Sequence, residues 1–189
     1  INSQLLSPII VDDKVFENSF SDKAFPYNSR NAKIVRYILA TIEKHNGSSQ
    51  AVNFNDDDAT IEHILPQNAD ESWEMDEEKQ LQLVFRLGNT CLLEKKLNMG
   101  LKNGSFEEKK RMGHGFLESG IRMNQYIAQK QKWTVEEMEE RSKLLTQRAC
   151  KVWSYPETTF RPKGKQLDVY TLDDDTELRG RDISRFTFH

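Results

Sequence analysis

One stretch of this chain constrains its fold more than any other: Thr60-Ile61-Glu62-His63-Ile64-Leu65-Pro66-Gln67. Its β-branched residues favour a short strand over 60–64, and Pro66 ends that strand because proline has no N–H to donate to a sheet. Glu62 and His63 are adjacent within it, and neighbouring side chains of a regular strand point to opposite faces. The stretch therefore predicts one ionisable side chain on each face of a small sheet, unless the chain bends before Pro66.

Helices are predicted on both sides of this strand. The segment 134–152 is the clearest, because Thr134 and Glu137 have capping-box spacing and an apolar stripe follows them. In other helices, Ser29 is expected to cap the N-terminus and Leu81 is expected on a buried face. Apolar residues at helical spacing and capping residues predict helices over 29–45, 78–86, 105–112, 119–131 and 134–152.

Two further short strands are predicted, one at 89–93 and one at 51–54. The first follows Gly88, which is expected to stop the preceding helix. Short strands among longer helical segments predict an α+β fold that is predominantly helical, with a small sheet packed among several helices.

Turn residues and composition divide the chain into four parts. Residues 1–28 are expected to be a loose lead-in with a helix near 13–20, and 29–155 the main domain. Pro and Gly residues mark 156–166 as a linker. Residues 167–189 are expected to form a β-rich tail, which is either a packed hairpin or the start of a further domain.

Composition excludes several classes of protein. No apolar run approaches the length needed to cross a bilayer, and the N-terminus has no signal-peptide pattern. The two cysteines, Cys91 and Cys150, are too few for a disulfide framework or a thiolate zinc site. We therefore expect a soluble, cytoplasmic protein with no membrane partner.

Charge is distributed unevenly along the chain, although the net charge is only −3. Residues 56–78 contain ten acidic residues and no Lys or Arg, whereas 95–111 contain six basic residues and two acidic ones. Two interpretations remain open: both segments are solvated faces, or the basic segment is a phosphate-facing surface. The basic residues are Lys95, Lys96, Lys102, Lys109, Lys110 and Arg111.

Glu62, His63 and Asn98 are residue types that phosphodiester hydrolysis uses. A neutral imidazole accepts a proton from water near pH 7, because its unperturbed pKa is about 6.5. Mg²⁺ or Mn²⁺ takes oxygen ligands, of which the protein usually supplies only a few. His63 is therefore a candidate general base, with Glu62 and Asn98 as candidate metal ligands. In a regular strand Glu62 and His63 cannot both contact one ion. Either a bend before Pro66 lets Glu62 reach the ion, or Glu62 acts from behind the residues that contact the ion.

Four motifs in a fixed order carry a resemblance to a known family. They are Ile61–Gln67, Leu87–Leu93, Leu97-Asn98, and Asn103-Gly104-Ser105-Phe106 with Lys109. The first three resemble the HNH or His-Me finger nucleases. The ordered set, over residues 30–155, is similar to the C-terminal domain of GmrSD-type, modification-dependent restriction endonucleases. This resemblance implies a ββα-metal core, in which two short strands and a helix surround one divalent ion, Mg²⁺ or Mn²⁺.

The resemblance also implies roles for particular residues. His63 falls at the position of the general base, Asn98 at that of a metal ligand, and Glu62 where relatives have a metal-ligating acid. Asn89 completes the candidate catalytic set and is expected to hold the loop before the helix. Asn103 is expected to touch metal or phosphate. The basic segment adds candidate nucleic-acid contacts at Lys95, Lys96, Lys102 and Lys109.

The resulting hypothesis is a metal-dependent DNA endonuclease or nickase that acts in defence against foreign, modified DNA. Family members carry an N-terminal nucleotide-hydrolysing domain with a ParB-like motif, which is absent here, so such a domain of the full-length protein is an expected partner besides DNA. Two alternatives remain: a DNA-binding or modification-sensing module with an inactive nuclease site, and a structural partner for the nucleotide-hydrolysing domain. RNA is an alternative substrate, because the same core cleaves either backbone.

Overall fold

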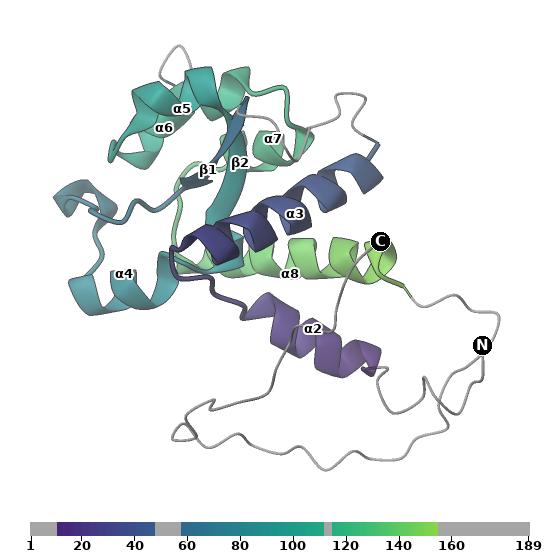
Figure 1. The fold of residues 1–189 in the computed structure, drawn as a ribbon. Coiled ribbons are helices and arrows are strands. Elements are labelled where there is room, and N and C mark those ends of the chain that lie inside the picture. The colour runs from purple at the N-terminus through teal and green to yellow at the C-terminus, as the bar shows by residue number, and fades with distance from the viewer. Residues whose placement is uncertain (1–10, 48–57, 112–114, 155–189) are drawn as a thin grey trace, which may run out of the picture. The chain divides into compact units, whose positions relative to one another are not determined.

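Two short strands lie at the centre of the described structure (Figure 1). The computed structural model describes residues 11–47, 58–111 and 115–154, which all belong to one unit that spans Ile9–Pro156. Strand β1 (Ala59–His63) pairs antiparallel with β2 (Thr90–Glu94). The strands predicted at 60–64 and 89–93 are therefore confirmed to within one residue at each end.

Helices make up most of the remaining described residues. They are α2 (Asp13–Ser21), α3 (Ser29–His45), α4 (Glu77–Leu83), α5 (Lys95–Leu101), α6 (Phe106–Arg111), α7 (Arg122–Ala128) and α8 (Val135–Val152). Three 3-10 turns connect them, namely η2 (Glu71–Trp73), η3 (Leu87–Asn89) and η4 (Phe116–Glu118). The prediction of an α+β fold that is predominantly helical is confirmed.

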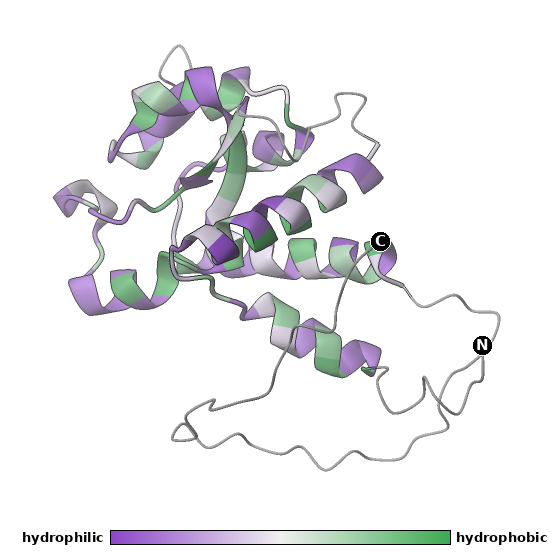
Figure 2. Ribbon diagram, in the orientation of Figure 1, coloured by the Kyte–Doolittle hydropathy of each residue, from purple (hydrophilic) through white to green (hydrophobic). Residues whose placement is uncertain are grey.

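The sheet separates two clusters of buried apolar side chains, because alternate strand residues point to opposite faces. Cys91 and Leu93 belong to one cluster, which also contains side chains of α5, α6 and α7. Leu92 belongs to the other cluster, which contains side chains of α2, α3 and α8, and Ile61 packs against it. Figure 2 shows β2 as hydrophobic along most of its length, as expected for a strand that is buried on both faces.

The helix ends show which local predictions hold. Thr134 and Glu137 form the predicted capping box of α8. Ser29 is not the cap of α3: the side chain of Asn28 accepts the Asn31 N–H at 2.8 Å, and Ser29 is the first helical residue. The prediction that Leu81 lies on a buried face is also wrong, because Leu81 is 70% exposed. Gln80 and Leu83 form the buried face of α4 instead.

Helix α2 packs against α8 and so joins the segment 11–28 to the rest of the unit. The predicted strand at 51–54, the linker at 156–166 and the tail at 167–189 lie outside the described residues. Among the helices that the structure describes, none is long and apolar enough to span a membrane.

Candidate functional site

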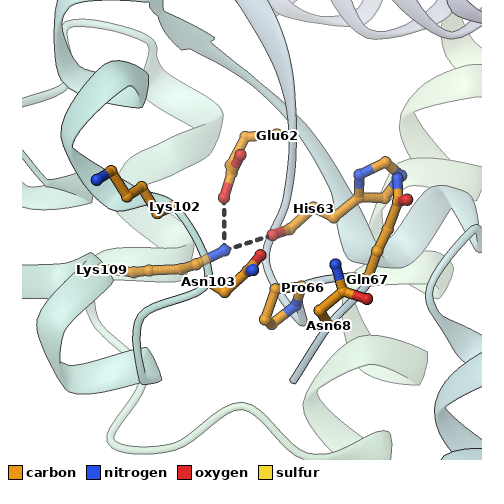
Figure 3. A pocket seen from close by; sticks show the side chains of 8 residues that line it. All are labelled: Glu62, His63, Pro66, Gln67, Asn68, Lys102, Asn103 and Lys109. Carbon is orange, nitrogen blue, oxygen red and sulfur yellow. Dashed lines mark hydrogen bonds and ion pairs between the residues drawn. The ribbon is translucent and has the colours of Figure 1, made fainter. Parts of the chain in front are cut away.

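A pocket of about 180 Å³ opens beside the end of β1 (Figure 3). Three segments line it: the end of β1 with the turn that follows, the turn after α5, and helix α6. The lining residues are Glu62, His63, Pro66, Gln67, Asn68, Lys102, Asn103 and Lys109. Seven of these eight side chains carry polar or charged groups, so the pocket suits a polar or charged ligand.

Glu62 and Lys109 form a buried ion pair at the base of this pocket. Lys109 Nζ lies 2.5 Å from Glu62 Oε1 and donates a second hydrogen bond, of 2.8 Å, to the carbonyl of His63. The Lys109 side chain is 0% exposed and that of Glu62 is 12% exposed. Burial raises the pKa of Glu62, while Lys109 and a hydrogen bond from Asn98 act in the opposite direction. The charge of Lys109 is therefore paired with Glu62 inside the protein and is not presented to solvent.

The His63 ring leaves β1 on the side away from Glu62, as strand alternation predicts (Figure 3). It meets the Phe85 ring edge-on at 5.6 Å between ring centroids. Burial first, and then the nearby charge of Lys109, lowers the pKa of His63 to about 4. His63 is consequently neutral at pH 7, which is the state that accepts a proton. Although the two side chains diverge, Glu62 and His63 both reach the lining of the same pocket.

Asn89 holds the backbone that follows His63. Its Oδ1 accepts the Leu65 N–H at 2.8 Å, and its Nδ2 donates to the Leu65 carbonyl at 2.9 Å. The same side chain also bonds the Val84 carbonyl and the Trp133 indole N–H. Asn89 is 0% exposed and all its polar atoms are used, so it fixes the turn before Pro66 from inside the protein and does not line the pocket.

Asn98 lies on α5 and faces β1. Its Nδ2 donates to Thr60 Oγ1 at 2.8 Å and is 3.5 Å from the carbonyl oxygen of Ile61. A hydrogen bond from Asn98 also opposes the rise in the pKa of Glu62 caused by burial, so the two side chains are neighbours. Asn98 is not among the residues that line the described pocket.

The predicted nucleic-acid contacts divide into exposed and buried residues. Lys95, Lys96, Lys102 and Asn103 are exposed, and of these Lys102 and Asn103 line the pocket. The prediction of a solvated lysine face fails for Lys109 and for Lys110, which is 6% exposed and donates to the Lys130 carbonyl. Helix α6 thus buries two of its basic side chains, Lys109 and Lys110, and leaves Arg111 exposed to solvent.

Two groups of site residues were missed by sequence reasoning. Gln67 and Asn68 line the pocket, and their position directly after Pro66 was the available signal. Arg141 is 1% exposed, and its Nη1 donates to the carbonyls of Gly88 and Thr90 at 2.7 and 2.8 Å. Its spacing of three from Met138 and four from Leu145 placed it on the buried stripe of α8, which indicated an internal role.

The residues present fit a hard divalent cation that is only partly coordinated by protein. Glu62 and Asn98 offer oxygen atoms, and Mg²⁺ or Mn²⁺ commonly completes its shell with water and substrate phosphate. Among the described residues, no group of three His, Cys, Asp or Glu side chains is placed to hold a metal alone. Burial raises the pKa of Cys91, the cross-strand partner of Glu62, to about 12, so Cys91 is a neutral thiol at pH 7.

Residues 10–148 match the family model of the C-terminal domain of GmrSD restriction endonucleases. The chain belongs to this family. Membership implies a restriction endonuclease domain, with DNA as the substrate class and a divalent metal as cofactor. The match covers every residue that lines the pocket of this GmrSD C-terminal domain. No curated protein matches the chain closely enough to add to this assignment.

Proposed function

We propose that this GmrSD C-terminal domain is a metal-dependent DNA endonuclease or nickase of the HNH, or His-Me finger, type. The observation that carries the proposal is the pocket in which a neutral His63 lies within the same lining as the Glu62 carboxylate. Strands β1 and β2 and helix α5, which contacts both strands, correspond to the two strands and the helix of that nuclease core.

His63 is the general base of the proposed reaction. Its ring is held by the Phe85 edge and by a backbone that Asn89 and Lys109 fix on either side. A neutral imidazole with one unprotonated nitrogen takes the proton of a water that attacks phosphorus. Because its pKa is lowered to about 4, His63 remains in the accepting state across the neutral pH range.

Glu62 and Asn98 would hold the divalent ion. When bound there, Mg²⁺ or Mn²⁺ supplies positive charge for the phosphoryl and leaving oxygens. The protein side of this arrangement is set by β1 and α5: Asn98 is tied to Thr60 at 2.8 Å, and Glu62 is held by Lys109. Asn89 acts as a positioning residue, since its side chain is buried.

Lys102 and Asn103 are the proposed nucleic-acid contacts at the pocket, with Lys95 and Lys96 on the exposed side of α5 extending the basic surface. The lysines attract the phosphate backbone, and Asn103 offers a neutral hydrogen-bonding group beside it. Gln67 and Asn68, across the pocket from Asn103, add amide groups that bond sugar or phosphate.

The biological setting follows from the family. A restriction endonuclease domain acts against foreign DNA, so we place this activity in the cytoplasm and in defence, with modified DNA as the target. A nucleotide-hydrolysing domain of the same full-length protein is the proposed partner. It would couple recognition of the DNA to cleavage by this domain.

Cleavage of supercoiled plasmid with Mg²⁺ or Mn²⁺ tests the proposal directly. The unaltered chain is expected to nick or linearise the plasmid, and His63→Ala to lose about 100-fold or more in rate, the usual contribution of a general base. His45→Ala is the matched control, because His45 is an exposed histidine at the end of α3. Equal cleavage by both variants, or none by the unaltered chain with either ion, would refute the proposal.

A further inference from the structure

Lys109 is an unusual lysine because it is fully buried. A lysine that is 0% exposed is rare in proteins unless its charge is paired. Here the pairing is with Glu62 and the carbonyl of His63, at 2.5 and 2.8 Å. Both acceptors belong to the strand that carries the candidate site, so the ammonium lies where it acts on any ligand of Glu62.

The ion pair changes what Glu62 offers to a divalent cation. One carboxylate oxygen, Oε1, is bonded to the ammonium, and the carboxylate also accepts a hydrogen bond from Asn98, so an ion must compete with these donors for Glu62. The negative charge of the carboxylate is already balanced by Lys109, and a second cation beside it is repelled by the ammonium. Asn98 adds an oxygen without charge. The protein by itself therefore presents a donor set with no net negative charge.

A nucleic-acid phosphate supplies what this donor set lacks. It brings a full negative charge and additional oxygens of the kind that Mg²⁺ and Mn²⁺ favour. The exposed Lys102 and Asn103 at the pocket are placed to hold such a phosphate within the same lining as Glu62. A bound ion would therefore raise the affinity of the site for the phosphate, and a bound phosphate would raise its affinity for the ion.

We propose that Lys109 keeps the metal site weak in the free protein, so that the divalent ion and nucleic acid bind cooperatively. This inference rests on the proposed function, because it takes Glu62 as a metal ligand. Lys109 acts through Glu62 and is a positioning residue. The cooperativity is reciprocal: if nucleic acid tightens ion binding by a given factor, the ion tightens nucleic-acid binding by the same factor.

Binding of Mn²⁺ to the free protein is the first test, measured at pH 8 by electron paramagnetic resonance. Lys109→Met removes the ammonium and keeps a long unbranched side chain, and it is expected to bind Mn²⁺ at least about tenfold more tightly than the unaltered chain. A purely structural lysine would not produce tighter binding when removed. Lys110→Met is the matched control, because Lys110 is also buried on α6 but bonds Glu107 and Lys130, and it should leave the affinity unchanged.

Cooperativity is the second test, and it does not depend on the folding of Lys109→Met. In a His63→Ala background, which keeps DNA intact, the affinity for a short duplex is measured by fluorescence anisotropy with and without Mn²⁺. We expect Mn²⁺ to tighten binding by about tenfold, within the usual range of coupling between sites. Adding Glu62→Gln should abolish this effect, and it also corrects for Mn²⁺ that binds DNA alone.

Three results would overturn the inference. They are Mn²⁺ affinity in Lys109→Met equal to or weaker than in the unaltered chain, Mn²⁺-dependent DNA affinity that persists in Glu62→Gln, and the absence of any Mn²⁺ effect on DNA affinity. The proposed nuclease function stands or falls on plasmid cleavage instead. A chain that cleaves DNA but shows any of these three results retains the function and loses the role given to Lys109.

Discussion

Asn89 and Leu65 are joined by two hydrogen bonds, one to the N–H and one to the carbonyl of the same residue, at 2.8 and 2.9 Å. A side-chain amide that bonds both backbone groups of one residue imitates a paired strand. The turn between His63 and Pro66 is therefore tied to Asn89, supported also by the Ile64 N–H, which donates to the Asn89 carbonyl.

Asn89→Ala should destabilise the domain strongly. The substitution leaves the Leu65 backbone, the Val84 carbonyl and the Trp133 indole without their partners in a buried place. We expect a loss of about 2–4 kcal/mol in the free energy of unfolding, measured by urea denaturation. Asn18→Ala, at an exposed asparagine on α2, is the control and should change it by less than about 0.5 kcal/mol. A small effect at Asn89 would contradict its role as a clamp.

Gly88→Ala should be poorly tolerated because α8 passes directly against this glycine. An added Cβ would lie 2.1 Å from Ser142 Oγ and 2.6 Å from the Met138 carbonyl oxygen. We expect the free energy of unfolding, measured by thermal denaturation, to fall by about 1–3 kcal/mol. Adding Ser142→Ala to the same chain should restore only part of this stability. The contact with Met138 involves its backbone carbonyl oxygen, which a side-chain substitution does not remove. Gly100→Ala on α5 meets no atom within 4 Å and should be neutral or stabilising by about 0.5–1 kcal/mol.

The pKa of His63 gives the domain a defined pH dependence. Its pKa is about 4 in the folded protein against an ordinary value of 6.5, so the unfolded chain takes up the proton first as the pH falls. Stability contributed by neutral His63 is complete above pH 6.5 and is lost progressively toward pH 4, by up to about 3 kcal/mol. Ring-proton NMR in metal-free protein checks the pKa, and urea unfolding at pH 7 and pH 5 checks the loss. His63→Gln should show a smaller loss between these two pH values, and an equal loss would contradict the assignment.

Lys102 occupies a backbone conformation that suits glycine. Its φ is 44° and its ψ is −132°, and the Gly104 N–H donates to the Leu101 carbonyl at 3.1 Å across the turn. Lys102→Gly should therefore stabilise the fold by about 1 kcal/mol and yet weaken DNA binding, with the salt slope falling by about 0.9. Lys102→Ala is the matched variant, because it removes the charge but keeps the strained φ, and it should weaken DNA binding without any gain in stability. Stability that falls in Lys102→Gly would show that the backbone at this position is not strained. A salt slope that does not change in either variant would show that the Lys102 charge does not contact the phosphate backbone.

Local signals in the sequence were sufficient for the two strands and for α8, but they did not predict α5, the helix that carries Asn98. Helix α8 begins at its capping box and follows one apolar stripe, and both strands lie within one residue of their predicted places. Helix α4 has only seven residues, so a rotation of about 100°, the angle between successive residues, decided whether Leu81 or Gln80 was buried. Periodicity over so short a segment does not fix that rotation.

Local sequence patterns could not predict the ion pair between Glu62 and Lys109. Glu62 and Lys109 are 47 residues apart, and Lys109 belongs to a run of basic residues that resembles a solvated face. The fourth motif included Lys109, but its burial and its bond to Glu62 came only from the structure, in which Lys102 is exposed. The candidate base was identifiable because its motif is contiguous, whereas the partners that set its environment come from distant parts of the chain.

Because β1 separates two apolar clusters, its two ionisable side chains lie in different surroundings. Glu62 belongs to the side that α5 and α6 cover, and His63 projects toward Phe85 on the other. Exchange of the 95–111 segment with that of a relative would change the partners of Glu62 and, through Lys109, the charge beside His63, whereas the contact with Phe85 would stay. A single strand of five residues thus turns its two ionisable side chains toward different neighbours, and one lysine connects the two.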